Sequence, residues 1–233
     1  MSDREKLRQL HHDHERDFEA LAKEAKHTLV AACKADGLDL HSIETRVKDL
    51  QSLLAKADRK EYNDPWNDCE DLVGVRAVVK FRSDLDALER LIKDGFHVIT
   101  REDKEDESPV EAFGYSSIHY ICTLRKDISG PRYDNIKEFK FEIQCRTILM
   151  DAWASVSHYL VYKGEASVPS ALRRDFHALS ALFYIADGQF QSFSESAKSS
   201  RSSVEQRAVT GSIADESEVN LETMSVVLEE LFP

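Results

Sequence analysis

Residues 139–153, FKFEIQCRTILMDAW, begin with the period of a β-strand and end with the period of a helix. The first eight residues alternate between apolar and polar side chains, which gives the strand one apolar and one polar face. The polar face carries Lys140, Glu142, Gln144 and Arg146. An apolar strand face must pack against a second layer, so the segment requires a sheet covered by helices. Its polar face meets either solvent or a substrate.

Four more segments have the composition and period of strands, at residues 43–48, 73–81, 96–100 and 115–124. Amphipathic helices are predicted between and after the strands, at residues 50–60, 83–93 and 147–162. The order is strand–helix, strand–helix, then three strands and a helix. This order predicts an α+β fold in which one mixed five-stranded sheet is flanked by helices.

Long helices are predicted on both sides of this core. The first has apolar residues every three or four positions up to Asp36 and Gly37, a C-cap signal, and the second follows Pro169. We expect five regions: an N-terminal helix (1–37), the core (38–165), a C-terminal helix packed on it (166–197), a Ser-rich linker (198–217) and a terminal helical segment (218–233). The last segment ends with its apolar pattern unfinished, which favours either a further C-terminal region or a short tail helix.

Net charge and cysteine spacing exclude several classes of protein. A charge of −12 over 233 residues disfavours broad nonspecific binding to nucleic acid or membranes, because no positive field attracts phosphate groups. The four cysteines lie far apart without a CxxC pair, which indicates reduced core residues.

The amino terminus is charged and no apolar run reaches about 18 residues, so we expect a cytoplasmic protein without a membrane segment.

The sequence HHDH at residues 11–14 could suggest a metal site or a His-Asp hydrolase pair. Consecutive helical residues point in different directions, however, and no second cluster in the sequence completes such a site. We therefore expect a solvated helix face here.

Cationic and hydroxyl side chains gather in the strand–helix unit at residues 43–60. They are Arg46 and Lys48 on one strand face, and Ser52, Lys56 and Arg59 at i, i+4 and i+7 on the helix. Asp49 is a good N-cap between the two elements. The cations can therefore converge with the free amides of the helix on an anion.

Polar faces of the other strands add more residues of this kind. They are Arg76; Tyr115, Ser117 and His119; and Glu142 and Gln144. If the strands are neighbours, they form a groove with a carboxylate at one end, cations at the other and an aromatic ring between. Magnesium, polyphosphate and a stacked base would each find a partner in such a groove.

Four segments resemble, in order and spacing, the synthetase domain of the RelA/SpoT superfamily, and in particular its small alarmone synthetases. They are RVKDLQSLLAKADRK, DLVGVRAVVKF, FGYSSIHY and FEIQCRTILMDAWASVSHYLVYK, within residues 43–190. The resemblance implies a nucleotidyltransferase-like fold. It also implies transfer of pyrophosphate from ATP to the 3'-hydroxyl of GTP or GDP, which releases AMP and forms (p)ppGpp.

The resemblance further implies roles for the polar side chains. For ATP, Arg46 and Arg76 would contact the adenine. Its phosphates would be bound by Lys48, Ser52, Lys56 and Arg59. Asp71 and Glu142 would bind Mg²⁺, and Glu142 would also activate the attacking hydroxyl. Those for the acceptor are Tyr115, stacked on guanine, with Ser117, His119 and Gln144 lining its site. In an ideal strand Asp71 would share the apolar side with Val73, so we expect the strand to begin irregularly there.

Asp151 departs from the family pattern, which usually has His or Asn nine residues after the glutamate. Its carboxylate could accept hydrogen bonds from guanine, or it could mark a different acceptor. Toxic relatives pyrophosphorylate the 3' CCA end of tRNA or make adenosine alarmones, so this alternative stays open, with an antitoxin as partner. A noncatalytic nucleotide-binding or interaction module is the third reading. Terminal helices would also allow a homo-oligomer.

Overall fold

The structure, a computed structural model, describes residues 3–103, 117–161, 170–209 and 224 of the chain. Contacts within the chain divide it into two units, residues 1–186 and 187–233. Every described residue that we expect to take part in function lies in the first unit.

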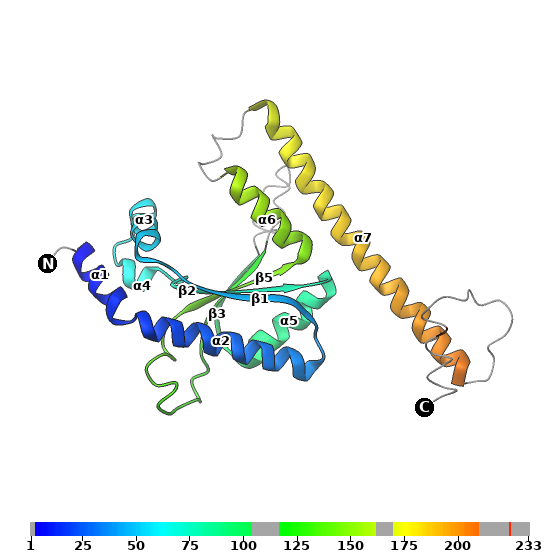
Figure 1. Cartoon of the computed structure of the whole chain (residues 1–233), viewed down its shortest axis with the longest axis horizontal. Coiled ribbons are helices and arrows are strands. Elements are labelled where there is room, and N and C mark those ends of the chain that lie inside the picture. The colour runs from blue at the N-terminus through cyan, green and yellow to red at the C-terminus, as the bar shows by residue number, and fades with distance from the viewer. Residues whose placement is uncertain (1–2, 104–116, 162–169, 210–223, 225–233) are drawn as a thin grey trace. The chain divides into compact units, whose positions relative to one another are not determined.

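A mixed five-stranded sheet forms the centre of the first unit (Figure 1). Its strands are β1 (Leu40–Val47), β2 (Val73–Val79), β3 (His97–Asp103), β4 (Ile118–Thr123) and β5 (Phe141–Thr147), in the order β1-β2-β5-β4-β3. β2 and β5 run parallel, and the other neighbouring strands run antiparallel. The predicted α+β fold with a mixed five-stranded sheet is therefore confirmed.

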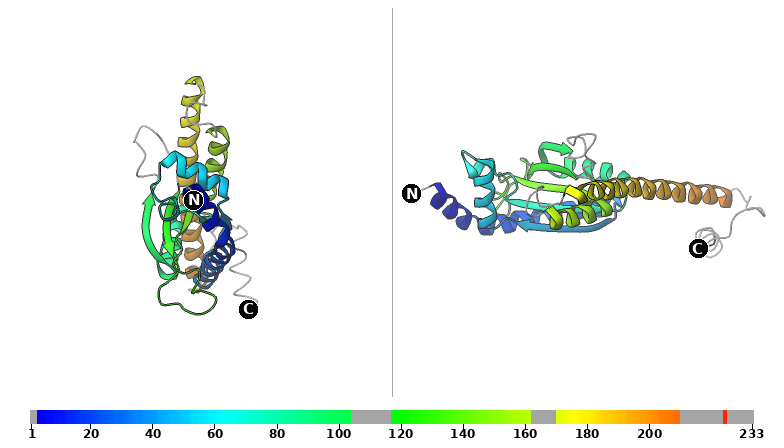
Figure 2. Two further views of the ribbon diagram at one scale, coloured as in Figure 1. Left: turned by 90° about the vertical axis from the view of Figure 1, so that its left-hand side faces the viewer. Right: turned by 90° about the horizontal axis from the view of Figure 1, so that it is seen from above.

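Seven helices complete the described part of the chain. They are α1 (Asp3–Asp13), α2 (Glu15–Asp36), α3 (Leu50–Lys60), α4 (Pro65–Asp68), α5 (Arg82–Gly95), α6 (Ile148–Val161) and α7 (Ser170–Val209). α2 runs along one face of the sheet, as Figures 1 and 2 show from different sides. α6 follows directly from the end of β5. Within the described residues, no helix has both the length and the apolar character needed to cross a bilayer.

The core lies between the apolar strand faces and α2. Val75 of β2 and Ile143 of β5 are almost completely buried, as are Phe18 and Leu29 of α2. Each large apolar side chain buried in this way contributes about 1.5–3 kcal/mol. The four cysteines are all buried free thiols, as the spacing predicted. Because this face of the sheet is filled, the polar residues of the strands must occupy the other one.

The N-terminal helix was predicted to be continuous, but it is broken at His14 into α1 and α2. The ring of His14 packs against Trp66 and Phe139, with ring centroids 5.5 and 5.1 Å apart, and its Nδ1 lies 2.9 Å from Asp17 Oδ2. His11 is buried, with 9% of its surface exposed, whereas the side chain of His14 is 35% exposed. The expectation of a solvated HHDH face is therefore wrong for His11, and His14 is only partly solvated because its ring packs against aromatic side chains. His12 is exposed, as expected.

α7 continues to Val209, into residues that were predicted to form a Ser-rich linker. Serine favours caps and turns because its hydroxyl competes for backbone groups, but a hydroxyl can also bond to a carbonyl within a helix. Here Ser196 Oγ donates to Ser192 O at 2.9 Å, and Ser203 Oγ donates to Ser200 O at 2.7 Å. The helix therefore accommodates its serines. Apart from Met224, the expected terminal segment at residues 218–233 lies outside the described residues.

Candidate active site

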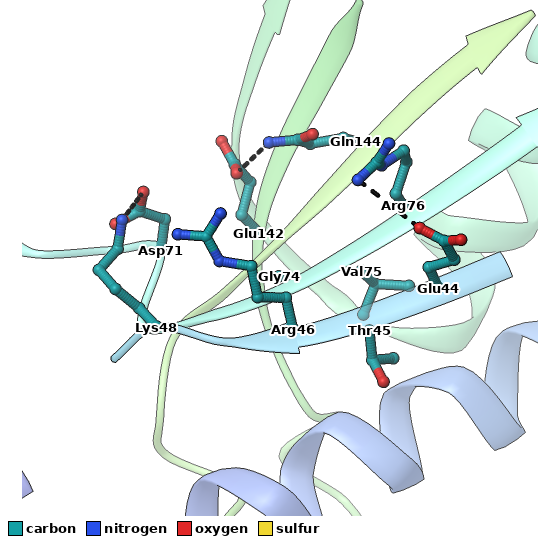
Figure 3. A pocket seen from close by; sticks show the side chains of 10 residues that line it. All are labelled: Glu44, Thr45, Arg46, Lys48, Asp71, Gly74, Val75, Arg76, Glu142 and Gln144. Carbon is teal, nitrogen blue, oxygen red and sulfur yellow. Dashed lines mark hydrogen bonds and ion pairs between the residues drawn. The ribbon is translucent and has the colours of Figure 1, made fainter. Parts of the chain in front are cut away.

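Charged and amide side chains of β1, β2 and β5 point away from α2 and surround a cavity of about 190 Å³ (Figure 3). The cavity is lined by Glu44, Thr45, Arg46, Lys48, Asp71, Gly74, Val75, Arg76, Glu142 and Gln144. Six of the residues predicted from the sequence therefore lie together.

Strand register explains why these residues meet. Arg46 pairs with Gly74, and Gly74 pairs with Glu142, so the three form one row across the sheet. The next row consists of Glu44, Arg76, Gln144 and His119. A Cβ atom at Gly74 would meet only the carbonyl oxygen of Arg46, at 3.9 Å. The glycine thus leaves open space between a cation and a carboxylate.

Asp71 lies in the turn before β2, where it joins two lysines. Lys48 Nζ is 2.8 Å from Asp71 Oδ2, and Lys56 Nζ of α3 is 2.8 Å from Asp71 Oδ1. Cys69 Sγ also donates to Oδ1, at 3.1 Å. Burial opposes ionisation of Asp71, but these three donors outweigh it and hold the pKa of its carboxyl well below the usual range. Because β2 begins only at Val73, the alternation of side chains along the strand does not fix the direction of Asp71, as expected.

Glu142 lies at the centre of a second network. His119 Nδ1 is 2.7 Å from Glu142 Oε1, and Gln144 Nε2 donates to Glu142 Oε2 at 2.7 Å. Burial raises the pKa of Glu142, but these partners outweigh burial and lower it, so the carboxylate is ionised at neutral pH. A carboxylate accepts only, so His119 Nδ1 carries a proton, and Nε2 of a neutral ring accepts from Ser117 Oγ at 2.6 Å.

Asp151, in the first turn of α6, joins two arginines. Its Oδ1 accepts from Arg76 Nη1 at 3.1 Å and from Arg146 Nη1 at 3.0 Å. Arg146 Nη2 in turn donates to Gln144 Oε1 at 3.1 Å. Burial lowers the pKa of Arg146, and Asp151 opposes that shift. The carboxylate therefore links α6 to arginine side chains of β2 and β5, one of which, Arg76, lines the cavity.

The structure places the remaining predicted residues less centrally. Ser52 donates its hydroxyl to the N-cap residue Asp49 at 2.7 Å and does not line the cavity. Arg59 is exposed on α3 and does not line it either. Tyr115 lies outside the described residues. Of the predicted phosphate ligands, Lys48 and Lys56 therefore stand nearest the carboxylates.

Two residues of this region were missed from the sequence. Glu44 lines the cavity, with its Oε2 3.6 Å from Arg76 Nη2. It precedes Arg46 on the same strand face, so the alternation that identified Arg46 could have identified it. His11 of α1 reaches the carbonyl oxygen of Lys48. No local signal could have shown that contact, because it joins residues 37 positions apart.

Comparison with known proteins gives one family. Residues 45–167, more than half of the chain, match the model described as a region found in RelA / SpoT proteins. The GTP pyrophosphokinase YwaC of Bacillus subtilis is 29% identical over 133 residues, which are 55% of this chain and 61% of the relative. For the GTP pyrophosphokinase YjbM of the same organism the identity is 28% over 144 residues, 59% of this chain and 64% of the relative. The matched region thus covers less than two thirds of each relative.

A solved structure shares the fold. It is small alarmone synthetase 1 from Bacillus subtilis bound to its product pppGpp, with a TM-score of 0.64 and 21% identity over 83% of this chain and 99% of that one. The matched region 45–167 contains all the cavity residues except Glu44. The chain therefore belongs to the RelA/SpoT family and has the fold of its small alarmone synthetases.

Proposed function

We propose that this protein is a GTP pyrophosphokinase, which transfers pyrophosphate from ATP to the 3'-hydroxyl of GTP or GDP and releases AMP. One observation carries the proposal: a single cavity joins the cations Arg46, Lys48 and Arg76 to the carboxylates Asp71 and Glu142. Phosphoryl and pyrophosphoryl transfer need this combination, because the site must both offset phosphate charge and orient a hydroxyl. The names of the two curated relatives support the same reaction.

ATP would bind across β1, β2 and the start of α3. The planar guanidinium groups of Arg46 and Arg76 suit the faces of an adenine ring. Lys48 and Lys56 suit the phosphates as flexible point charges, and both already meet a carboxylate oxygen at Asp71. Ser52 and Arg59, which lie outside the cavity lining, would join the phosphate contacts only after side-chain movement.

Asp71 and Glu142 would hold Mg²⁺. Both line the cavity, and the charge of Asp71 partly opposes the net lowering of the pKa of Glu142, because the two carboxylates repel each other. A divalent cation would relieve that repulsion. The described residues hold no cluster of three or more His, Cys, Asp or Glu ligands, but Mg²⁺ shared with a nucleotide commonly needs only one or two carboxylates. When bound, the ion would neutralise charge on the transferred phosphates.

Glu142 would receive the proton of the attacking hydroxyl. In the proposed step the 3'-oxygen of the acceptor bonds to the β-phosphorus of ATP, and the bond from that phosphorus to the α,β-bridging oxygen breaks. The electron pair leaves with AMP, and the hydroxyl proton passes to Glu142. Its lowered pKa keeps Glu142 ionised and ready to accept a hydrogen bond, while His119 and Gln144 fix its two oxygens.

Ser117, His119 and Gln144 would line the acceptor side, together with Tyr115 on the guanine. Asp151 was expected there as well. Its contacts favour the donor side instead, because its Oδ1 is shared by two arginines, one of which is the proposed adenine ligand Arg76. We therefore propose that Asp151 orients Arg76, and we keep guanine binding as the alternative that experiment must exclude.

Chromatography of a reaction with ATP, Mg²⁺ and GDP or GTP tests the proposal. We expect AMP together with ppGpp or pppGpp, and neither product from Glu142→Gln. Absence of AMP release with every nucleotide acceptor would refute it and favour a noncatalytic module. A tRNA acceptor, an antitoxin, self-assembly and a cytoplasmic location remain predictions from the sequence.

A further inference from the structure

His11 is buried in α1 yet reaches the phosphate side of the cavity. Its Nε2 lies 2.8 Å from the backbone oxygen of Lys48, and 9% of its surface is exposed. A carbonyl oxygen only accepts, so His11 donates through Nε2. This histidine belongs to the HHDH sequence, which the proposed reaction does not use.

The peptide that His11 contacts connects β1 to α3. Lys48 is the residue between the last position of β1 and Asp49, the N-cap of α3. Its N–H donates to Leu72 O at 2.8 Å, so the backbone of Lys48 is held on two sides. The side chain of Lys48 then runs from this fixed point to Asp71.

α1 is also attached to α3 through an ion pair between Arg4 and Asp58. That pair is exposed and contributes little. The His11 bond is shielded better, since it is part-buried, and it lies at the end of α3 where the helix begins. A shift of this peptide would displace Lys48 and the first turn of α3 together.

We propose that His11 is a positioning residue for ATP: it fixes the Lys48 peptide and so holds Lys48 in place for the nucleotide phosphates. The inference rests on the proposed function, since it assigns Lys48 to ATP. It adds the N-terminal helix, which lies outside the matched region 45–167, to the parts of the chain that shape the site. His11 itself touches no substrate in this arrangement.

The test compares His11→Gln with His11→Met. The two replacements have similar length and volume, but only glutamine offers an N–H in place of Nε2. His12→Met is the matched control, because His12 is the exposed neighbour in the same helix. Loss of one net hydrogen bond corresponds to about a fivefold change in affinity. We therefore expect His11→Met to raise KM for ATP about fivefold, with KM for GDP and kcat within about twofold of the parent.

We expect His11→Gln to stay within about twofold of the parent in KM for ATP, and His12→Met to match the parent. Equal increases in KM for ATP and for GDP, or equal behaviour of His11→Gln and His11→Met, would overturn the proposal. Calorimetric titration of each variant with Mg²⁺ and ATP needs no acceptor. It therefore tests the His11 proposal even if the protein transfers pyrophosphate to none of the acceptors offered.

Discussion

Replacing Asp151 by alanine removes the carboxylate that two arginines share. Arg76 loses its 3.1 Å bond, and Arg146 loses its 3.0 Å bond. The two losses differ in effect because the arginines differ in exposure, with 37% of the Arg76 side chain exposed and 14% of that of Arg146. One substitution should therefore change both nucleotide binding and stability.

The magnitudes follow from these exposures. The Arg76–Asp151 pair is partly screened by solvent, so we assign it about 1 kcal/mol, which is about a fivefold rise in KM for ATP. Arg146 would keep only its bond to Gln144 among the contacts described above, while its charge stays buried. An underpaired, largely buried guanidinium costs about 1–3 kcal/mol, so the free energy of unfolding should fall by roughly 2 kcal/mol.

Steady-state kinetics with ATP and GDP varied in turn provide the assay. For Asp151→Ala we expect KM for ATP to rise about fivefold and KM for GDP to stay within twofold. In the Arg76→Ala background, Asp151→Ala should raise KM for ATP no further, because the interaction is already lost. Asp86→Ala, an exposed substitution on α5, serves as the control. A rise in KM for GDP with KM for ATP unchanged would refute this account and would favour the alternative in which Asp151 binds guanine.

Three more substitutions or titrations test the rest of the site. Glu142→Gln should lower kcat roughly 10³-fold while ATP still binds in calorimetry. A near-normal kcat would show that Glu142 does not accept the proton of the hydroxyl. Asp71→Asn should cost about 1–3 kcal/mol of unfolding free energy at pH 7 in urea titrations. The lowered pKa of Asp71 stabilises the fold above the unfolded value near pH 4, so this difference should shrink as the pH falls below about 4 and should not grow. Because Lys48 and Lys56 occupy Asp71, Mg²⁺ alone should bind far more weakly than Mg²⁺ with ATP; equal affinities would contradict the proposed coupling.

The sheet could be predicted from the sequence because each strand shows its own alternation. Residues 139–146 show an apolar and a polar face directly, and the structure buries Phe141, Ile143 and Cys145 while leaving Glu142 and Gln144 toward the cavity. Strand order could not be predicted in the same way. The parallel pairing of β2 with β5 joins residues about 70 positions apart, which local periodicity does not contain.

Partners of the individual side chains could not be predicted. The sequence placed Lys48 and Asp71 in different roles, and the structure joins them directly because the turn before β2 lies beside the end of β1. Likewise, His14 fits a helical period, but α1 and α2 are separated there, where its ring packs against Trp66 and Phe139. Such contacts depend on tertiary packing, which overrides local preference.

Identification of the acceptor of the pyrophosphate group tests the central claim most directly. ATP labelled in its β- and γ-phosphates should be incubated with the protein, Mg²⁺, GDP and deacylated tRNA together, and the labelled products separated. Our account predicts one AMP released for each label transferred, with the label on the guanine nucleotide and none transferred by Glu142→Gln. Label on the tRNA, or no transferred label, would contradict it.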